Sequence, residues 1–139
     1  MAANLKPIFI KQGNFTVARM AAANTASDGS GTLVTVVTAA TDGTRVDGVR
    51  FINSQASAAA SGAKVCRVFL SDTSGANYRI VGEVAMAAAT RSTTVIGAVA
   101  IYTFDQPIVM KSGQIMAVCM SVYAGAQDQT DACAFAGDY

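Results

Sequence analysis

Short hydrophobic runs separated by turn residues recur along the whole chain. The runs alternate or are rich in β-branched residues, and the separators are rich in Gly, Ser, Asn and Asp. This pattern is typical of antiparallel strands joined by tight turns. The runs predict about eight strands, at residues 15–20, 32–39, 45–53, 64–71, 78–86, 94–104, 114–123 and 132–138. We therefore expect an all-β fold, a single-domain antiparallel β-sandwich that is jelly-roll-like.

The last nine residues, DACAFAGDY, alternate in the way that a strand requires. Cys133 and Phe135 lie on one side of an extended chain, and Ala132, Ala134 and Ala136 lie on the other. We expect this segment to lie inside the fold. Residues 78–86 alternate as well, with one face made of Tyr78, Ile80, Val84 and Met86 and the other made of Arg79, Val81, Glu83 and Ala85.

Turn and breaker residues refine this prediction. Asp42 and Gly43 predict a hairpin turn between two strands, because Gly tolerates the positive φ of a tight turn. Pro107 predicts a strand start or an edge strand, because proline has no N–H for a ladder bond. Residues 55–63 have no large side chain and are expected to be an exposed connection. Residues 84–90, VAMAAAT, would also suit a short helix.

The segment ahead of the first firm strand pattern differs from the rest. We expect residues 1–12 to form an N-terminal arm or edge strand, followed by a β-sandwich domain at residues 13–139. The arm carries the candidate partner-binding residues Leu5, Pro7, Ile8, Phe9 and Ile10. They could lie across a neighbouring protein, and the alternative is an edge strand of the chain's own sandwich.

The charge of the chain argues against two classes of partner. Ten Lys and Arg residues against nine Asp and Glu residues give a net charge of +1, and the basic residues are scattered. We therefore expect no nucleic acid and no membrane among the partners. Residues 1–10 lack a signal-peptide pattern, and the apolar run at 95–102 is too short to span a bilayer. We expect a chain made in a reducing cytoplasm, with Cys66, Cys119 and Cys133 as small buried hydrophobic residues.

The residues available for catalysis are few. The chain has no His, which removes the usual general base and most zinc sites. The nearest carboxylate pairs are Asp42 with Asp47 and Asp128 with Asp131, and all lie in or beside turns, where Asp commonly bonds its own backbone. Catalysis or calcium binding is the alternative for these pairs. We expect no enzyme, no cofactor and no metal.

Carbohydrate binding is a weaker alternative. Stacking on a sugar ring needs exposed aromatic side chains, and the chain has no Trp. Tyr78, Tyr102 and Tyr123 fall within strand runs, so we expect them to be core or half-buried residues.

Several segments resemble a family of small virion structural proteins of tailed bacteriophages. They are PIFI at residues 7–10, TASDGSGTLVTVVTAATDGTRVDGVRF at 25–51, RVFLSDTSGANYRIVGEV at 67–84 and AFAGDY at 134–139. The resemblance implies a capsid decoration (cement) protein on the capsid exterior, made in the bacterial host cytoplasm. Its implied partners are the major capsid protein of the same virion and further copies of itself in a homotrimer. The alternative is a tail or fibre component that contacts the host surface or a carbohydrate.

Overall fold

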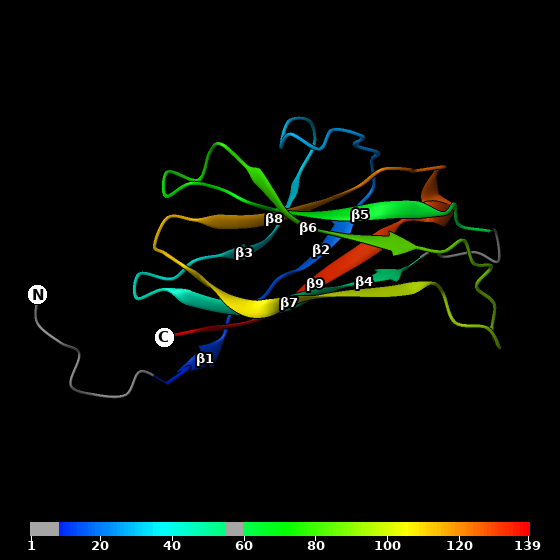
Figure 1. Ribbon diagram of the computed structural model, residues 1–139. Helices are drawn as coiled ribbons and strands as arrows, with labels where there is room; N and C mark the ends of the chain where they lie inside the picture. The colour runs from blue at the N-terminus through cyan, green and yellow to red at the C-terminus, as the bar shows by residue number, and fades with distance from the viewer. Residues whose placement is uncertain (1–8, 55–59) are drawn as a thin grey trace, which may run out of the picture.

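The computed structural model describes residues 9–54 and 60–139, and these form two packed antiparallel sheets (Figure 1). The first sheet holds β1 (Gln12–Gly13), β2 (Val17–Met20), β9 (Thr130–Asp138), β4 (Thr44–Asn53) and β7 (Val99–Met110). The second holds β3 (Val34–Thr38), β8 (Ile115–Met120), β5 (Lys64–Leu70) and β6 (Arg79–Met86). A short 3-10 helix, η1 (Ala126–Asp128), precedes β9. The predicted all-β sandwich is confirmed.

The strand pairing is nested. β2 pairs with β9, β3 with β8, β4 with β7 and β5 with β6, all of them antiparallel. The pairs β2–β9 and β4–β7 lie in the first sheet, and the pairs β3–β8 and β5–β6 lie in the second. Successive pairs along the chain therefore alternate between the two sheets, and β5–β6 is the innermost pair. This nesting is the strand order of a jelly roll. β1 adds a short edge to the C-terminal half of β9.

The two sheets also meet along their edges. The Tyr102 hydroxyl on β7 donates a hydrogen bond to the Val81 carbonyl on β6 at 3.3 Å. A Cβ added at Gly82 would lie 2.4 Å from the Tyr102 ring, so the glycine makes room for that ring. At the opposite edge, the Thr16 amide ahead of β2 donates to the Val36 carbonyl on β3 at 3.1 Å. Edge strands tied across the sandwich leave fewer unpaired groups for other chains to bind.

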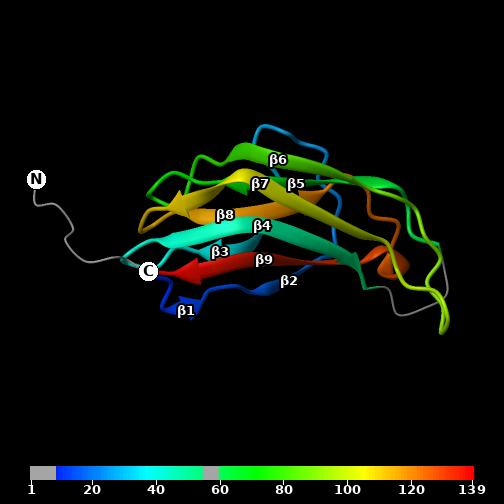
Figure 2. The same cartoon turned by 60° about the horizontal axis from the view of Figure 1, so that its bottom comes forward.

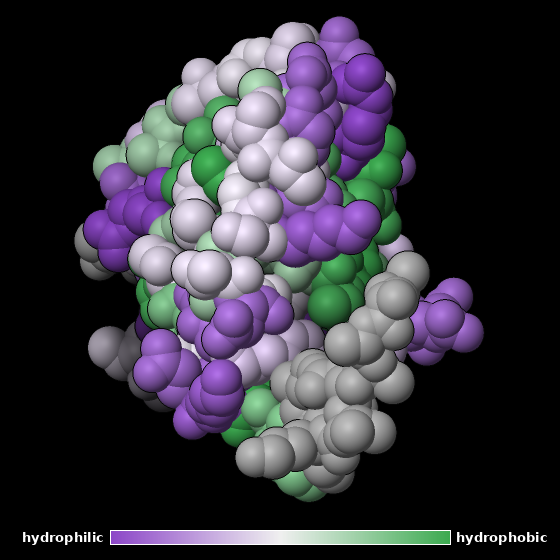
Figure 3. Space-filling model, turned by 90° about the vertical axis from the view of Figure 1, so that its left-hand side faces the viewer, coloured by the Kyte–Doolittle hydropathy of each residue, from purple (hydrophilic) through white to green (hydrophobic). Residues whose placement is uncertain are grey.

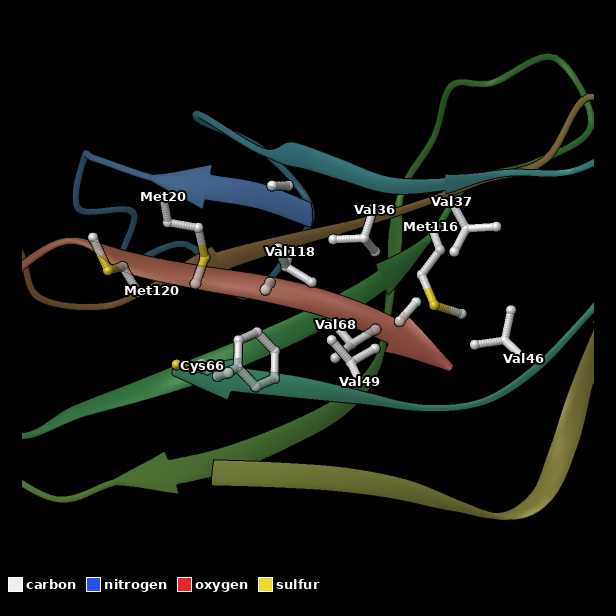
Figure 4. Close-up of a cluster of buried hydrophobic side chains, with 14 of the residues drawn as sticks. Met20, Val36, Val37, Val46, Val49, Cys66, Val68, Met116, Val118 and Met120 are labelled. Atoms are coloured by element: carbon white, nitrogen blue, oxygen red, sulfur yellow. The ribbon is translucent and has the colours of Figure 1, made fainter. Parts of the chain in front are cut away.

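Methionine and valine fill the space between the sheets (Figure 4). Met20 and Met120 lie toward one end of the core and Val46 toward the other, with Val49 and Val68 between them. The buried positions of β9 are small by comparison, because Ala132 and Ala134 face inward. Unbranched Met side chains adapt to irregular gaps, which suits a core with little Leu.

The loop between β2 and β3 covers part of the outer face of the second sheet (Figure 1). The Asn24 amide donates to the Met120 carbonyl at 2.8 Å. The Asn24 carbonyl accepts from the Cys119 thiol, and Arg67 donates to the Thr25 carbonyl at 3.3 Å. As a result Cys119 is buried although it lies on the side of β8 that faces away from the sandwich core.

Two local predictions are corrected, and the prediction of an edge strand at Pro107 is confirmed. The Asp42–Gly43 turn is no hairpin, since β3 and β4 belong to different sheets and the turn carries the chain from one sheet to the other. Gly43 does have the expected positive φ, 102°. Residues 94–98 precede β7 and are not part of it, and β7 runs on through Pro107. Pro107 lies in an irregularity of an edge strand, where Val46 pairs with Ile108 but Gly48 pairs with Thr103.

The alternation predicted for residues 78–86 fails at one end. A register shift between Val68 and Phe69 leaves Val81 as an extra residue on β6. A β-bulge of this kind changes which face the following residues point to. Ile80 is therefore 38% exposed, while Val81 and Val84 both pack against the core. Residues 87–90 form no helix, so the strand interpretation of this region holds.

Two predicted segments, the N-terminal arm at residues 1–12 and the connection at residues 55–63, are only partly described. Residues 1–8 and 55–59 lie outside the described residues. Of the expected connection at 55–63, Ser61 is buried, and its hydroxyl donates to the Ala89 carbonyl at 3.1 Å, so exposure was a wrong prediction there. Of the expected arm, Lys11 donates from its amide to the Asp138 carbonyl at 2.7 Å, and β1 follows as an edge strand on β9.

Candidate functional site

The outer face of the first sheet carries a group of exposed hydrophobic side chains. Figure 2 looks onto this face, with β2, β9, β4 and β7 lying in that order. Val17 is 62% exposed, Phe135 is 42% exposed and Ile101 is 52% exposed. No segment of residues 9–54 or 60–139 covers them as the β2–β3 loop covers the second sheet. This is an apolar surface of the kind that binding partners cover.

Part of this face is hollowed into an open groove, which we call the apolar groove. It is lined by Ile10, Phe15, Val17, Cys133 and Phe135, together with the charged residues Asp47 and Arg50. Phe15 is 57% exposed, so two phenylalanine rings and a valine meet solvent here. Large aromatic side chains of this kind supply much of the binding energy at protein interfaces.

Strand register explains why these residues share one face. Val17 lies opposite Cys133, Cys133 lies opposite Arg50, and Arg50 lies opposite Ile101. Directly opposed residues in a sheet point to the same side, so the four form one row across β2, β9, β4 and β7. Because side chains alternate along a strand, Phe135 on β9 points the same way as Cys133.

Charged side chains surround the apolar groove as ion pairs. Arg19 donates to Asp131 at 2.9 Å, and Arg45 donates to Asp47 at 2.8 Å. The hydrogen bond and charge of Asp131 raise the pKa of Arg19. Arg50 is exposed between the apolar positions. The face thus offers apolar contact area with a charged rim, which is the usual layout of a protein interface.

Of the predicted arm residues, Ile10 lines this groove. Leu5, Pro7 and Ile8 lie outside the described residues. Phe9 is 74% exposed and Ile10 is 47% exposed, and Ile10 packs close to Gly137 of β9. Figure 3 views the end of the sandwich where the C-terminus lies, and there hydrophobic patches stand beside hydrophilic side chains.

Sequence reasoning missed Phe15, Val17 and Phe135 as surface residues. The alternation in DACAFAGDY was recognised, but both of its faces are apolar, so it could not show which face is buried. The usual expectation that the larger side chains point inward would have been wrong, because the alanines face the core.

The carboxylates named as candidate pairs each bind a basic side chain. Asp42 pairs with Lys11 at 3.4 Å, and Asp47 and Asp131 pair with arginines on the outer face of the first sheet. Asp128 differs, because its side chain is 0% exposed and contacts the ammonium of Lys64, which is 1% exposed. Asp128 does bond nearby backbone as predicted, through the Ala124 amide, but its pairing with Lys64 was not foreseen.

The cysteine prediction is right for two residues and wrong for one. Cys66 and Cys119 are buried, and burial raises the pKa of the Cys66 thiol to about 12 and also raises the pKa of Cys119. Cys133 is only half-buried, because it lies on the outer face of the first sheet in the apolar groove. Tyr78, Tyr102 and Tyr123 are half-buried, as predicted.

Comparisons of the chain with protein-family models, curated proteins and solved structures returned no match. Within the described ranges, no cluster of three or more His, Cys, Asp or Glu residues could hold a metal ion. The same ranges contain no helix that is long and apolar enough to cross a membrane. Function therefore has to be inferred from the surfaces of the chain itself.

Proposed function

We propose that the chain is a virion structural protein of a tailed phage that binds the assembled head shell, as capsid decoration proteins do. The observation that carries the proposal is the exposed apolar face of the first sheet, which includes the apolar groove. The sequence resemblance and the jelly-roll strand order support the same class of protein. The partner would be the major capsid protein, and the chain would bind it by surface contact without catalysis.

The physical basis is burial of apolar area. Each square ångström of apolar surface removed from water contributes about 25 cal/mol, before the costs of association are subtracted. Phe15, Val17 and Phe135 would supply this area, and the charged rim would set the orientation. The exposed Phe9 and Ile10 extend the same surface toward the predicted arm.

Stabilisation of the shell follows from selective binding. A ligand that binds only the assembled state lowers the free energy of that state, and so raises the temperature that it survives. Many copies on one shell would add their contributions. A homotrimer would strengthen the effect, because three linked contacts give a higher effective concentration than one.

The test uses head shells from the phage that encodes the chain, prepared without this protein. We expect the purified protein to sediment with assembled shells but not with unassembled capsid protein, and to raise the temperature at which shells release their contents. Sedimentation with neither form, together with unchanged heat survival, would contradict the proposal. Recovery of the protein in purified tails at low copy number would instead indicate the tail or fibre role.

A further inference from the structure

Lys64 occupies a core position at the start of β5. The inward positions of this strand are Lys64, Cys66 and Val68, and all three are buried. Lys64 pairs with Asp128, which is the last residue of η1. This helix lies at the end of the sandwich opposite the C-terminus (Figure 1). Burying two charges is costly, because the loss of their hydration can exceed their mutual attraction. A chain with so few charged residues has nevertheless placed a cation and an anion in its interior.

Both members of this ion pair make further hydrogen bonds. The Lys64 Nζ contacts Asp128 Oδ1 directly and lies 3.1 Å from the Asp128 carbonyl oxygen. The carboxylate also accepts two backbone hydrogen bonds, from the Gly62 amide to Oδ1 at 3.1 Å and from the Ala124 amide to Oδ2 at 3.0 Å. An amine is thus held against a carboxyl group that backbone N–H groups polarise.

We propose that Lys64 and Asp128 form an intramolecular isopeptide bond. The ammonium first passes one proton to the carboxylate, which gives a neutral amine and a carboxylic acid. The amine nitrogen then forms a bond to Cγ of Asp128, the bond from Cγ to one carboxyl oxygen breaks, and that oxygen leaves as water with a second proton from the amine. The products are one amide and one water molecule, and the step needs no oxidant, reductant or other reactant.

Three features of the site favour this reaction. Direct contact replaces a bimolecular encounter, which is worth a large rate factor in oriented intramolecular reactions. The Ala124 and Gly62 amides point at the oxygens on which negative charge develops. Thr130 Oγ1 accepts a hydrogen bond from Nζ at 3.5 Å, which helps to orient the amine.

The environment also favours the product. The amide replaces a buried ion pair and removes its desolvation penalty. The bond would link the start of β5 to the segment just before β9, joining the two sheets covalently. This inference does not depend on the proposed function.

Mass spectrometry of the purified full chain tests the proposal. We expect the intact denatured protein to be lighter than its sequence by one water molecule. After trypsin digestion, we expect no cleavage after Lys64 and a branched species in which residues 51–67 are joined to residues 112–139. The exposed pair of Lys11 and Asp42 is an internal control, and cleavage after Lys11 should be normal.

Two further observations keep the test decisive. Loss of water by cyclisation of an Asp within its own peptide would give the same intact mass, but it would leave the two tryptic peptides separate. The variant Asp128→Ala should regain the full mass and cleavage after Lys64, and this peptide readout does not require the variant to fold. Wild-type protein with its full mass and with free peptides 51–64 and 112–139 would overturn the proposal.

Discussion

The side-chain amide of Asn14 donates a hydrogen bond to the carboxylate of Asp138 at 2.6 Å, across 124 positions of the chain. The Thr44 hydroxyl donates to the same carboxylate oxygen at 2.5 Å. One carboxylate therefore ties the segment before β2, the start of β4 and the end of β9 together. This cluster fixes the N-terminal strands against the last strand beside the apolar groove.

The first prediction concerns the pH dependence that Asp138 gives to stability. Burial raises the pKa of Asp138, but hydrogen bonds from Thr44, Asn14 and Gln12 lower it further than burial raises it. A lowered pKa in the folded state means that the stabilisation is complete above the unfolded pKa of about 4 and is lost as the pH falls through the folded value. We expect Asp138→Asn to lower the free energy of unfolding by about 1–2 kcal/mol near pH 7.

Urea unfolding of the wild type and of Asp138→Asn at several pH values checks this prediction. The difference between the two should shrink steadily from about pH 5 downward. Other carboxylates with lowered pKa values, such as Asp72, affect both proteins equally and cancel in the difference. A difference that stays constant down to pH 2 would show that the carboxylate is not stabilised by these bonds.

The second prediction compares a buried and an exposed lysine. Lys64→Met prevents the proposed amide and leaves the Asp128 carboxylate buried without a cation, so we expect the free energy of unfolding to fall by at least about 3–5 kcal/mol. Lys11→Met removes the exposed partner of Asp42 and should change it by less than about 1 kcal/mol. Denaturant unfolding of both variants measures the difference. Similar small effects at the two sites would mean that Asp128 is not held in a dry interior.

The third prediction concerns the closed edge between β6 and β7. Gly82→Ala would place a methyl group against the ring of Tyr102, which is held by its hydrogen bond to the Val81 carbonyl and by an edge contact with Phe104. Overpacking of this kind costs about 1–3 kcal/mol. Gly13→Ala is the matched control, because its added Cβ would meet nothing closer than 3.5 Å. Equal melting temperatures for the two variants would argue against this packing.

The fourth prediction uses the different surroundings of the three thiols. Burial raises the pKa of Cys66 to about 12 and raises that of Cys119, so both stay protonated and shielded at pH 8. Cys133 lies on the outer face and should be alkylated by iodoacetamide in the native protein. Mass spectrometry should show one label before unfolding and three after it. Rapid native labelling of Cys66 would contradict the burial of β5.

Much of the fold was predictable, because alternation and turn residues are local properties. The strand segments and the sandwich class follow from them. The sequence did not show whether the strand after the Asp42–Gly43 turn belongs to the same sheet as the strand before it. A tight turn with a positive-φ glycine can join two strands of one sheet or connect two sheets. The bulge at Val81 was also hidden, because the extra residue is defined by its partner strand β5.

The candidate site was predictable only in part. Phe9 and Ile10 were identified from their apolar character ahead of the first strand. Phe15 and Phe135 were not, because they gather only when β9 pairs with the N-terminal strands at one edge and β4 at the other. The contact between Lys64 and Asp128 joins residues 64 positions apart and depends on tertiary structure, so no local sequence pattern predicts it.

We have proposed that the outer face of the first sheet binds the head shell. The most direct test is the affinity of Phe135→Ser for assembled shells, beside Ile80→Ser, which alters a similarly exposed residue on the second sheet. We expect Phe135→Ser to weaken binding at least tenfold, a loss of about 1.4 kcal/mol or more. Ile80→Ser should bind like the wild type, with both variants folded by circular dichroism. Unchanged binding by Phe135→Ser, or equal losses in the two variants, would contradict the claim.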